Sequence, residues 1–127
     1  MPFTEVAYTT YPAKDLAESR AFYEGVLGLT PASIIPVGTT GDEGWVEYEL
    51  GSHTFGIGKM EGFTQPSEHG PCAALEAVDF DEVVAALRKA ETKFRTEPFE
   101  TPVCHMAIVL DPAGNSLIIH KRKPGHA

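Results

Sequence analysis

Two copies of the motif Asp-x-x-Glu divide the sequence and limit the folds available to it. The first copy occupies residues 15–18 (DLAE) and the second residues 79–82 (DFDE), so they lie 64 positions apart (79 − 15), about half of the 127 residues. In each copy the aspartate is placed to accept from the free N–H groups of a first helical turn, and the glutamate to reach back. Strand-like segments precede and follow each copy, so the sequence predicts a duplicated βαβββ unit.

The first half fits this order segment by segment. Residues 5–11 are rich in Thr, Tyr and Val and end at Pro12, which lacks the N–H that a continuing strand needs. Apolar residues then recur at helical spacing from Leu16 to Leu27, and Gly28 follows where a left-handed residue commonly ends a helix. Strands are predicted at residues 32–37, 45–50 and 54–59, with a polar loop at 38–44 and a turn at 51–53.

The second half repeats the same order after an irregular stretch. Residues 61–71 carry Gly, Pro, Ser and His without periodicity and are predicted to be a linker. We therefore expect a single domain over residues 1–127, with modules at 1–60 and 72–127. The second module is predicted to contain a strand at 72–78, a helix that begins after Asp79 with its apolar stripe on Phe80, Val83, Val84 and Leu87, and strands at 93–97, 103–110 and 116–121.

The last two predicted strands are joined by a turn at residues 111–115 (DPAGN). Pro112 presets φ for a turn, the Asp111 side chain can accept from nearby N–H groups, and Gly114 tolerates positive φ. This chemistry predicts a tight antiparallel hairpin. Because strand side chains alternate between faces, each strand should present one set on a common face. These sets are Cys104, Met106 and Ile108, and Ser116, Ile118 and His120.

Composition excludes several classes of protein. With 43% hydrophobic and 22% charged residues, the chain is expected to form one globular core. A formal net charge of −8 argues against nucleic-acid binding, which needs clustered Lys and Arg. There is no apolar run of membrane-spanning length and no signal-peptide pattern, so we expect no membrane partner and a cytoplasmic location. The two cysteines, Cys72 and Cys104, are expected to be free thiols.

Two segments resemble the vicinal oxygen chelate superfamily, which holds glyoxalase I, bleomycin-resistance proteins and extradiol dioxygenases. They are residues 14–29 (KDLAESRAFYEGVLGL) and residues 110–121 (LDPAGNSLIIHK), and the order of elements extends the resemblance over the whole chain. The resemblance implies an α+β fold in which two βαβββ modules form a curled mixed sheet around a cavity. It also implies assembly as a homodimer.

Enzymes of this superfamily usually hold a divalent metal with one residue on the first and last strand of each module. The corresponding positions here are Tyr8, Gly56 or a neighbour, Cys72 and Ile118. Isoleucine and glycine have no side-chain donor, so two ligands at most remain where a catalytic site normally uses three. We therefore expect no metal cofactor. A displaced soft-metal set, Tyr8, Cys72, Cys104 and His120, is the alternative.

The resemblance and the strand alternation together give a set of candidate site residues. Glu76 shares the inferred cavity face with Cys72 and is the candidate general base. Glu47 and Glu49 share one face of their strand, where solvation is the competing interpretation of the pair. His105 is expected to point away from the cavity. The predicted ligand-binding residues are Tyr8, Trp45, Glu47, Cys72, Cys104, Met106, Ile108, Ile118 and His120.

Two functional hypotheses follow from these residues. The first is a metal-free protein of the bleomycin-resistance kind that binds a small, cationic or aromatic organic molecule in its cavity. The second is an enzyme, namely a lyase, isomerase or dioxygenase that uses either a displaced metal set or a metal-free acid/base group such as Glu76. A metal assay on protein purified without chelator separates the two.

Overall fold

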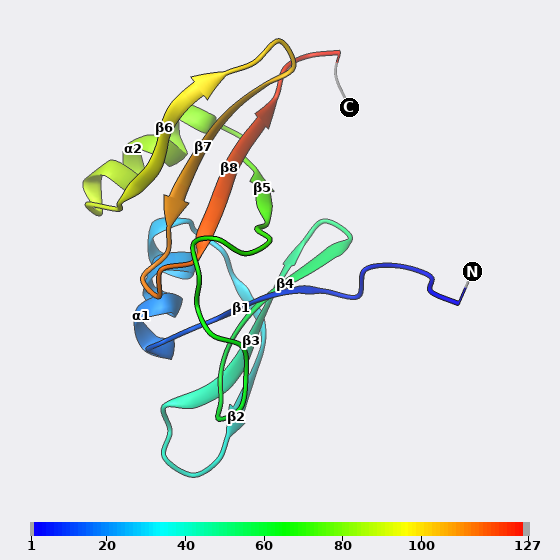
Figure 1. Ribbon diagram of the computed structural model, residues 1–127, viewed down its shortest axis with the longest axis vertical. Helices are drawn as coiled ribbons and strands as arrows, with labels where there is room; N and C mark the ends of the chain where they lie inside the picture. Colours follow the sequence, from blue (N-terminus) through cyan, green and yellow to red (C-terminus); the bar gives the residue numbers. More distant parts are fainter. Residues whose placement is uncertain (1, 126–127) are drawn as a thin grey trace. The chain divides into compact units, whose positions relative to one another are not determined.

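The computed structural model describes residues 2–125, and its contacts divide the chain into a first unit up to Pro66 and a second unit from Ser67 (Figure 1). This boundary lies inside the stretch 61–71. Both units have the order strand, helix, three strands, which confirms the predicted α+β fold of two βαβββ modules. The first contains β1 (Thr9–Pro12), α1 (Leu16–Arg20), its π-helical continuation η1 (Ala21–Val26), β2 (Pro31–Val37), β3 (Glu43–Leu50) and β4 (His53–Lys59). The second contains β5 (Ala74–Glu76), α2 (Phe80–Lys89), β6 (Phe94–Glu100), β7 (Cys104–Leu110) and β8 (Ser116–Arg122).

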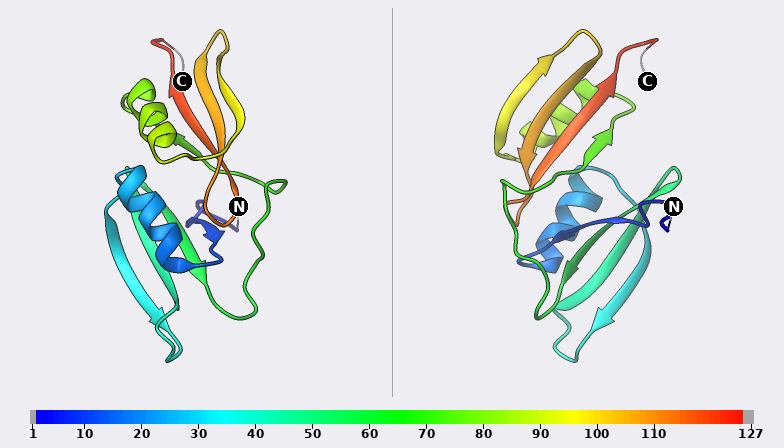
Figure 2. Two further views of the ribbon diagram at one scale, coloured as in Figure 1. Left: turned by 90° about the vertical axis from the view of Figure 1, so that its left-hand side faces the viewer. Right: turned by 45° about the vertical axis from the view of Figure 1, so that its right-hand side comes forward.

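The sheet of the first unit has the strand order β1-β4-β3-β2, with β1 parallel to β4 and the other neighbours antiparallel. Figure 2 shows α1 lying across one face of this sheet. The side chains between them are almost fully buried and largely aromatic: Tyr23, Val46, Tyr48, Phe55 and Ile57. The opposite side of the sheet, which we call the helix-free face of the first unit, carries the alternate residues of β3 and β4.

Aspartate caps begin both helices, as the sequence predicts. The side chain of Asp15 accepts from the N–H of Glu18 at 3.0 Å, and that of Asp79 accepts from the N–H of Glu82 at 3.0 Å. Each bond satisfies one of the N–H groups that the first helical turn leaves without an intrahelical partner. The repeated motif therefore marks the two helix starts correctly.

The first helix departs from the regular helix predicted over residues 16–27. After Arg20 it widens into η1, where the N–H of Leu27 bonds to the carbonyl of Phe22, five residues back, at 3.0 Å. The wider turn lets two consecutive aromatic residues, Phe22 and Tyr23, both reach the core, with 6% and 0% of their surface exposed. Gly28 then ends the helical segment with φ of +75°, as expected.

The sheet of the second unit has the order β5-β8-β7-β6, with β5 parallel to β8. One face packs against α2, where Leu87 is fully buried together with Ala107, Val109 and Leu117. The predicted hairpin between β7 and β8 is present: Asp111 Oδ1 accepts from the N–H groups of Ala113 and Asn115 at 3.0 and 2.9 Å. The other side of this sheet is the helix-free face of the second unit.

Two predicted strands are shorter than the sequence suggested. Instead of residues 5–11, β1 covers only Thr9–Pro12, and Pro12 lies inside the strand because β1 pairs with β4 alone and its other edge needs no donor. Instead of residues 72–78, β5 covers only Ala74–Glu76, since its ladder with β8 begins where Ile118 donates to the carbonyl of Ala73. Tyr8 and Cys72 therefore lie just outside the strands on which they were predicted.

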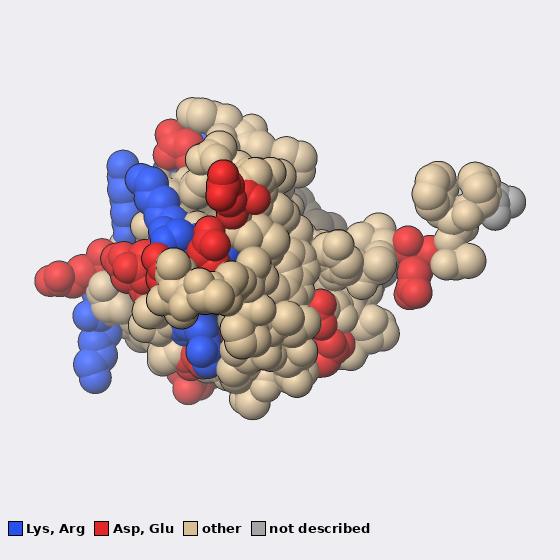
Figure 3. All heavy atoms as spheres, turned by 90° about the horizontal axis from the view of Figure 1, so that it is seen from below, with Lys and Arg blue, Asp and Glu red and all other residues tan. Residues whose placement is uncertain are grey.

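Charged side chains are mixed in sign over the surface. In the view of Figure 3, acidic side chains lie beside basic ones. Three ion pairs of the structure join such groups: Lys59 with Asp42, Arg88 with Glu97, and Lys123 with Glu100. No helix within residues 2–125 is long and apolar enough to cross a membrane.

Candidate functional site

An indole ring laid over two glycines is the main feature of the helix-free face of the first unit. Trp45 on β3 pairs with Gly58 on β4, and Gly56 lies two residues along the same face. A Cβ added at Gly58 would come within 2.9 Å of the Trp45 ring, and one at Gly56 within 3.4 Å. Only residues without a side chain let the ring lie this close to the strand. Gly56 and Gly58 therefore form a flat surface under the indole, which we call the glycine bed.

Two further aromatic rings meet Trp45 edge-on. Tyr8 lies at a centroid distance of 5.4 Å with an interplanar angle of 81°, and Phe63 lies at 5.9 Å and 68°. Both arrangements are the T-shaped geometry that aromatic quadrupoles favour. Half of the Tyr8 surface is exposed, so this ring group is accessible from outside. Phe63, which the sequence analysis did not single out, comes from the stretch predicted to be linker.

A carboxylate borders these rings. The indole Nε1–H of Trp45 donates to Oε2 of Glu47 at 2.9 Å, which fixes the indole and holds the carboxylate on the helix-free face. Glu49, two residues on, instead accepts from the Thr54 hydroxyl at 3.1 Å. The first unit thus offers an aromatic surface with one carboxylate at its edge. Such a surface suits planar organic molecules, and cations through ring quadrupoles and charge.

An apolar strip with a polar end occupies the helix-free face of the second unit. Cross-strand pairing sets Ile108 opposite Ile118 and Met106 opposite His120. All four are only partly buried, whereas the residues between them on β7 and β8 are fully or almost fully buried against α2. These four predicted site residues therefore share one face. That they bind a ligand remains a prediction.

Glu76, His120 and Arg122 form the polar end of this strip. Glu76 Oε1 lies 2.6 Å from Nδ1 of His120, and its Oε2 accepts from the backbone N–H of Arg122 at 2.8 Å. The guanidinium of Arg122 lies 3.5 Å from Oε1. Partial burial by itself raises the pKa of Glu76, but the bonds from Arg122 and His120 and the nearby positive charges outweigh it, so this pKa is lowered. Two hydrogen bonds and one ion pair therefore hold this carboxylate and favour its ionised form.

The two cysteines differ in position: strand pairing sets Cys104 opposite Arg122, on the same face of β7 as Met106, whereas Cys72 lies outside the strands. Cys72 is exposed and precedes β5, while Cys104 is buried at the start of β7 with its sulfur 3.2 Å from the Thr101 hydroxyl. His105 lies on the opposite side of β7, 5.9 Å from the ring of Phe80 on α2, as the alternation predicts. Within residues 2–125, no three His, Cys, Asp or Glu side chains converge to hold a metal ion.

The positions that the superfamily uses for its metal do not fit a metal here. Among the four corresponding positions, Gly56 on β4 and Ile118 on β8 have no side-chain donor. Tyr8 and Cys72, the two donors that counting placed there, precede the strands.

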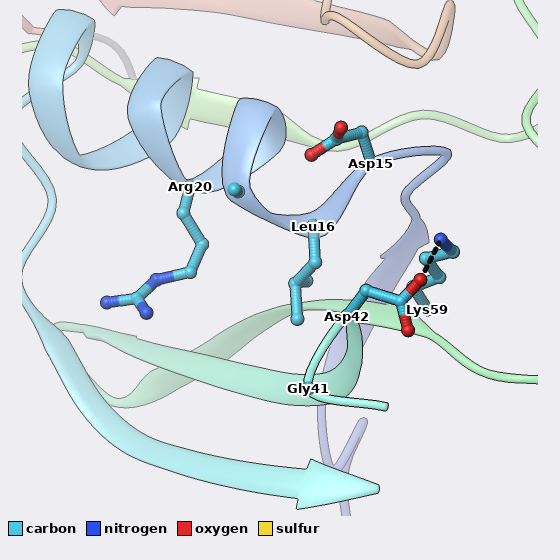
Figure 4. Close-up of a pocket in the computed structure, with 7 residues that line it drawn as sticks. Asp15, Leu16, Arg20, Gly41, Asp42 and Lys59 are labelled. Carbon is cyan, nitrogen blue, oxygen red and sulfur yellow. Dashed lines mark hydrogen bonds and ion pairs between the residues drawn. The ribbon is translucent and has the colours of Figure 1, made fainter. Parts of the chain in front are cut away.

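A pocket of about 350 Å³ lies beside the start of α1 (Figure 4). Its charged groups are already engaged: Lys59 with Asp42 at 3.5 Å, Arg20 with Glu24 at 2.7 Å, and Asp15 with the helix N–H described above. In Figure 4 the Arg20 side chain points away from Asp15. No motif in the sequence signalled this pocket, because its residues come from three separate segments: Asp15, Leu16, Ala17, Arg20, Gly41, Asp42 and Lys59.

Comparison with known proteins gives one family. Residues 5–119 match the model of the Glyoxalase/Bleomycin resistance protein/Dioxygenase superfamily. No curated protein matches the sequence significantly.

Solved structures share the fold at low sequence identity. A glyoxylase/bleomycin resistance protein/dioxygenase domain from Frankia sp. EAN1pec is 19% identical, with a TM-score of 0.77 over 98% of this chain and 96% of that one. TnmS3, an antibiotic binding protein from Streptomyces sp. CB03234, is 20% identical, with a TM-score of 0.72 over 97% and 99%. The fosfomycin resistance protein FosX from Mesorhizobium loti is 15% identical, with a TM-score of 0.69 over 93% and 91%.

Proposed function

Because the chain belongs to the Glyoxalase/Bleomycin resistance protein/Dioxygenase superfamily, we propose that it binds a small organic molecule on its helix-free sheet faces without a divalent metal. The observation that carries this proposal is the indole of Trp45 on its bed of Gly56 and Gly58. An indole that packs flat on two glycines of the helix-free face offers a stacking surface for a planar ligand.

The chemistry around Trp45 indicates the class of ligand. Tyr8 and Phe63 extend the apolar surface, and Glu47 supplies a negative charge beside it. Aromatic molecules that carry a positive charge match both features. The structural relatives include a protein described as antibiotic binding and one described as a fosfomycin resistance protein, which supports a role in capturing a bioactive small molecule.

The absence of a metal in this proposal rests on the chemistry of the positions that the superfamily uses for its metal. Gly56 and Ile118 supply no side-chain donor atom, and Tyr8 and Cys72 alone fall short of the three protein ligands of an ordinary catalytic site. A ligand held without a metal must obtain its affinity from stacking, apolar contact and hydrogen bonds. In the first unit, Trp45 supplies the stacking surface, Tyr8 and Phe63 supply apolar contact, and Glu47 supplies a charged acceptor.

Fluorescence of Trp45 tests the proposal directly, because it is the single tryptophan of the chain. The protein is titrated with a panel of neutral, cationic and anionic aromatic compounds in buffer that contains a chelator. We expect saturable quenching by at least one compound, strongest among the cations. Quenching that appears only after addition of zinc, nickel or iron contradicts the metal-free part, and no quenching by any compound contradicts the whole proposal.

We further propose that the protein is a homodimer. Four-stranded sheets with open edges invite pairing with another chain, and several apolar side chains are exposed. Among them, Phe3 and Val6 in the segment before β1 keep 80% and 70% of their surface exposed. A second copy of the chain would bury the apolar side chains of this segment.

A further inference from the structure

We infer that His120, oriented by Glu76, accepts a proton from the bound molecule, so the second unit takes a weak acid with an ionisable O–H or N–H and holds it as the anion. This inference rests on the proposed function and adds the ligand chemistry of the second unit. The observations that carry it are the contact between Nδ1 of His120 and Glu76, the partial exposure of the imidazole, and the apolar strip beside it.

The carboxylate decides which imidazole nitrogen carries the proton. An ionised carboxylate only accepts hydrogen bonds, so Nδ1 of His120 must donate across the 2.6 Å contact to Glu76 Oε1. Neutral imidazole has one N–H, which leaves Nε2 with a free lone pair. His120 therefore offers an acceptor at Nε2, and Glu76 stabilises the imidazolium that forms when Nε2 takes a proton.

Glu76 itself is poorly suited to the role of base that the sequence suggested. Both of its oxygens are occupied, by His120 and by the backbone N–H of Arg122, and these donors favour its ionised form. A carboxylate held in this way orients another group better than it abstracts a proton. The acceptor role thus moves from Glu76 to its partner His120, whose side chain keeps 25% of its surface exposed.

The groups around His120 favour an anionic product. On β8 its neighbours on the same face are Ile118 and Arg122, on β7 the residue opposite is Met106, and on β5 it faces Glu76. Glu76 and Arg122 are the charged groups among them. The imidazolium would pair with Glu76, while the guanidinium of Arg122 offers a positive charge to the ligand anion and the uncharged Met106 and Ile118 adjoin its apolar part.

The proton transfer is complete in itself. The O–H or N–H bond of the ligand breaks, its electron pair stays on the ligand heteroatom, and the proton forms a new N–H bond at Nε2 of His120. No oxidant, reductant or metal takes part. After the step, the imidazolium lies between two anions, with the Glu76 carboxylate at Nδ1 and the ligand anion at Nε2.

4-Nitrophenol tests this inference, because its anion absorbs visible light and its neutral form does not. Binding is measured by equilibrium dialysis, and absorbance is recorded at a pH where the free probe is mostly neutral. We expect bound probe to appear as the anion, and the ¹⁵N spectrum of His120 to change from the Nδ1–H tautomer to imidazolium. His120→Gln should abolish the anion signal, and Glu76→Gln should lower the ratio of bound anion to bound neutral probe about tenfold, because the imidazolium loses its charged partner.

His105→Gln is the matched control, since His105 lies on the other side of β7 against Phe80. It should leave the anion signal unchanged. Thermal melts show whether each variant folds, and the tautomer measured in the unmodified protein decides the matter if His120→Gln does not fold.

Three results overturn the inference and leave the proposed function standing. These are a bound probe that stays neutral, an anion signal that survives in folded His120→Gln, and an Nε2–H tautomer in the free protein. The same holds if 4-nitrophenol fails to bind while other aromatic compounds quench Trp45. Failure of every compound in the panel instead overturns the proposed function.

Discussion

The ring of Trp45 lies so close to the backbone of Gly58 that a Cβ at residue 58 would stand 2.9 Å from its Cε3 atom. Real Cβ atoms do not approach other carbons this closely, so the ring and a side chain at residue 58 exclude each other. Met60 and Phe63 lie within 3.3 Å of the same point, which leaves the ring little room to move aside. Glycine at this position is therefore a requirement of the aromatic surface.

Gly58→Ala is predicted to displace Trp45 and weaken ligand binding. We expect the free energy of unfolding to fall by about 1–3 kcal/mol, the usual cost of an overpacked site, and the quenching titration of Trp45 to shift to higher ligand concentration. Gly25→Ala is the control, because a Cβ there meets nothing within 4 Å and φ is not positive. If both variants bind as the unmodified protein does, the glycine bed does not support the site.

A pair of aspartate substitutions on β7 tests the two faces of the second sheet. Ala107 is fully buried on the side of α2, whereas Met106 is partly exposed on the helix-free face opposite His120. A carboxylate at 107 must be desolvated or protonated, so Ala107→Asp should destabilise the fold by more than about 2 kcal/mol. Met106→Asp should be better tolerated in folding and should impair ligand capture. Thermal melts of both variants and a binding titration of Met106→Asp test this. If Met106→Asp proves the more destabilising of the two, the assignment of Met106 to the helix-free face is contradicted.

The sequence predicted the architecture well because its signals are local. Asp15 and Asp79 cap the two helices through bonds to residues three positions away, and the turn at residues 111–115 is held by Asp111. These motifs are short, and their chemistry acts within a few residues. Alternation along β7 then assigned Met106 and Ala107 to opposite faces, as observed.

The site was harder to predict because it depends on register and distant contacts. Counting from the capping motifs placed Cys72 at a ligand position on a strand, whereas β5 begins only at Ala74. The contact of Glu76 with His120 joins residues 44 positions apart, and no spacing rule gives it. The glycine bed under Trp45 was likewise not predicted, because glycines in a strand indicate that some group approaches the backbone closely but do not identify that group. The cytoplasmic location, the homodimer and the lack of a metal stay predictions.

Metal content is predicted to be negligible. Ile118 and the glycine-rich strand at residues 54–58 offer no ligand side chain, and Tyr8 and Cys72 together fall short of the three protein ligands that a catalytic site normally uses. We therefore expect less than about 0.1 equivalent of any first-row divalent ion in protein purified without chelator. Elemental analysis by mass spectrometry measures this, with Cys72→Ala as the companion variant. Stoichiometric zinc, nickel or iron that disappears in Cys72→Ala contradicts the prediction and supports the enzyme hypothesis with a displaced metal set.

Light scattering is predicted to return twice the 13.7 kDa mass of the chain at micromolar concentration. The apolar segment before β1 supplies the variant: Phe3→Ser with Val6→Ser removes two exposed apolar side chains without touching either core. If this segment contributes to the dimer, the double variant should dissociate at higher concentration than the unmodified protein. A monomer mass for the unmodified protein contradicts the proposed assembly.

The ion pair of Glu24 with Arg20 predicts how stability changes in acid. The hydrogen bond from Arg20 at 2.7 Å is the largest cause of the lowered pKa of Glu24, helped by the hydroxyl of buried Tyr48 at 2.9 Å and opposed by burial. A carboxyl whose pKa is lower in the folded chain than in the unfolded chain stabilises the fold above the unfolded pKa, and this contribution is lost as pH falls through the folded pKa.

At neutral pH, Glu24→Gln should therefore lower the free energy of unfolding by about 1 kcal/mol, the scale of a partly exposed charged pair. Glutamine keeps an oxygen for the Tyr48 hydroxyl, so the variant removes mainly the charge. Urea unfolding at a series of pH values should show the difference between the two proteins shrinking below the ordinary pKa of glutamate, and a difference that stays constant with pH would mean that the charge of Glu24 does not stabilise the fold.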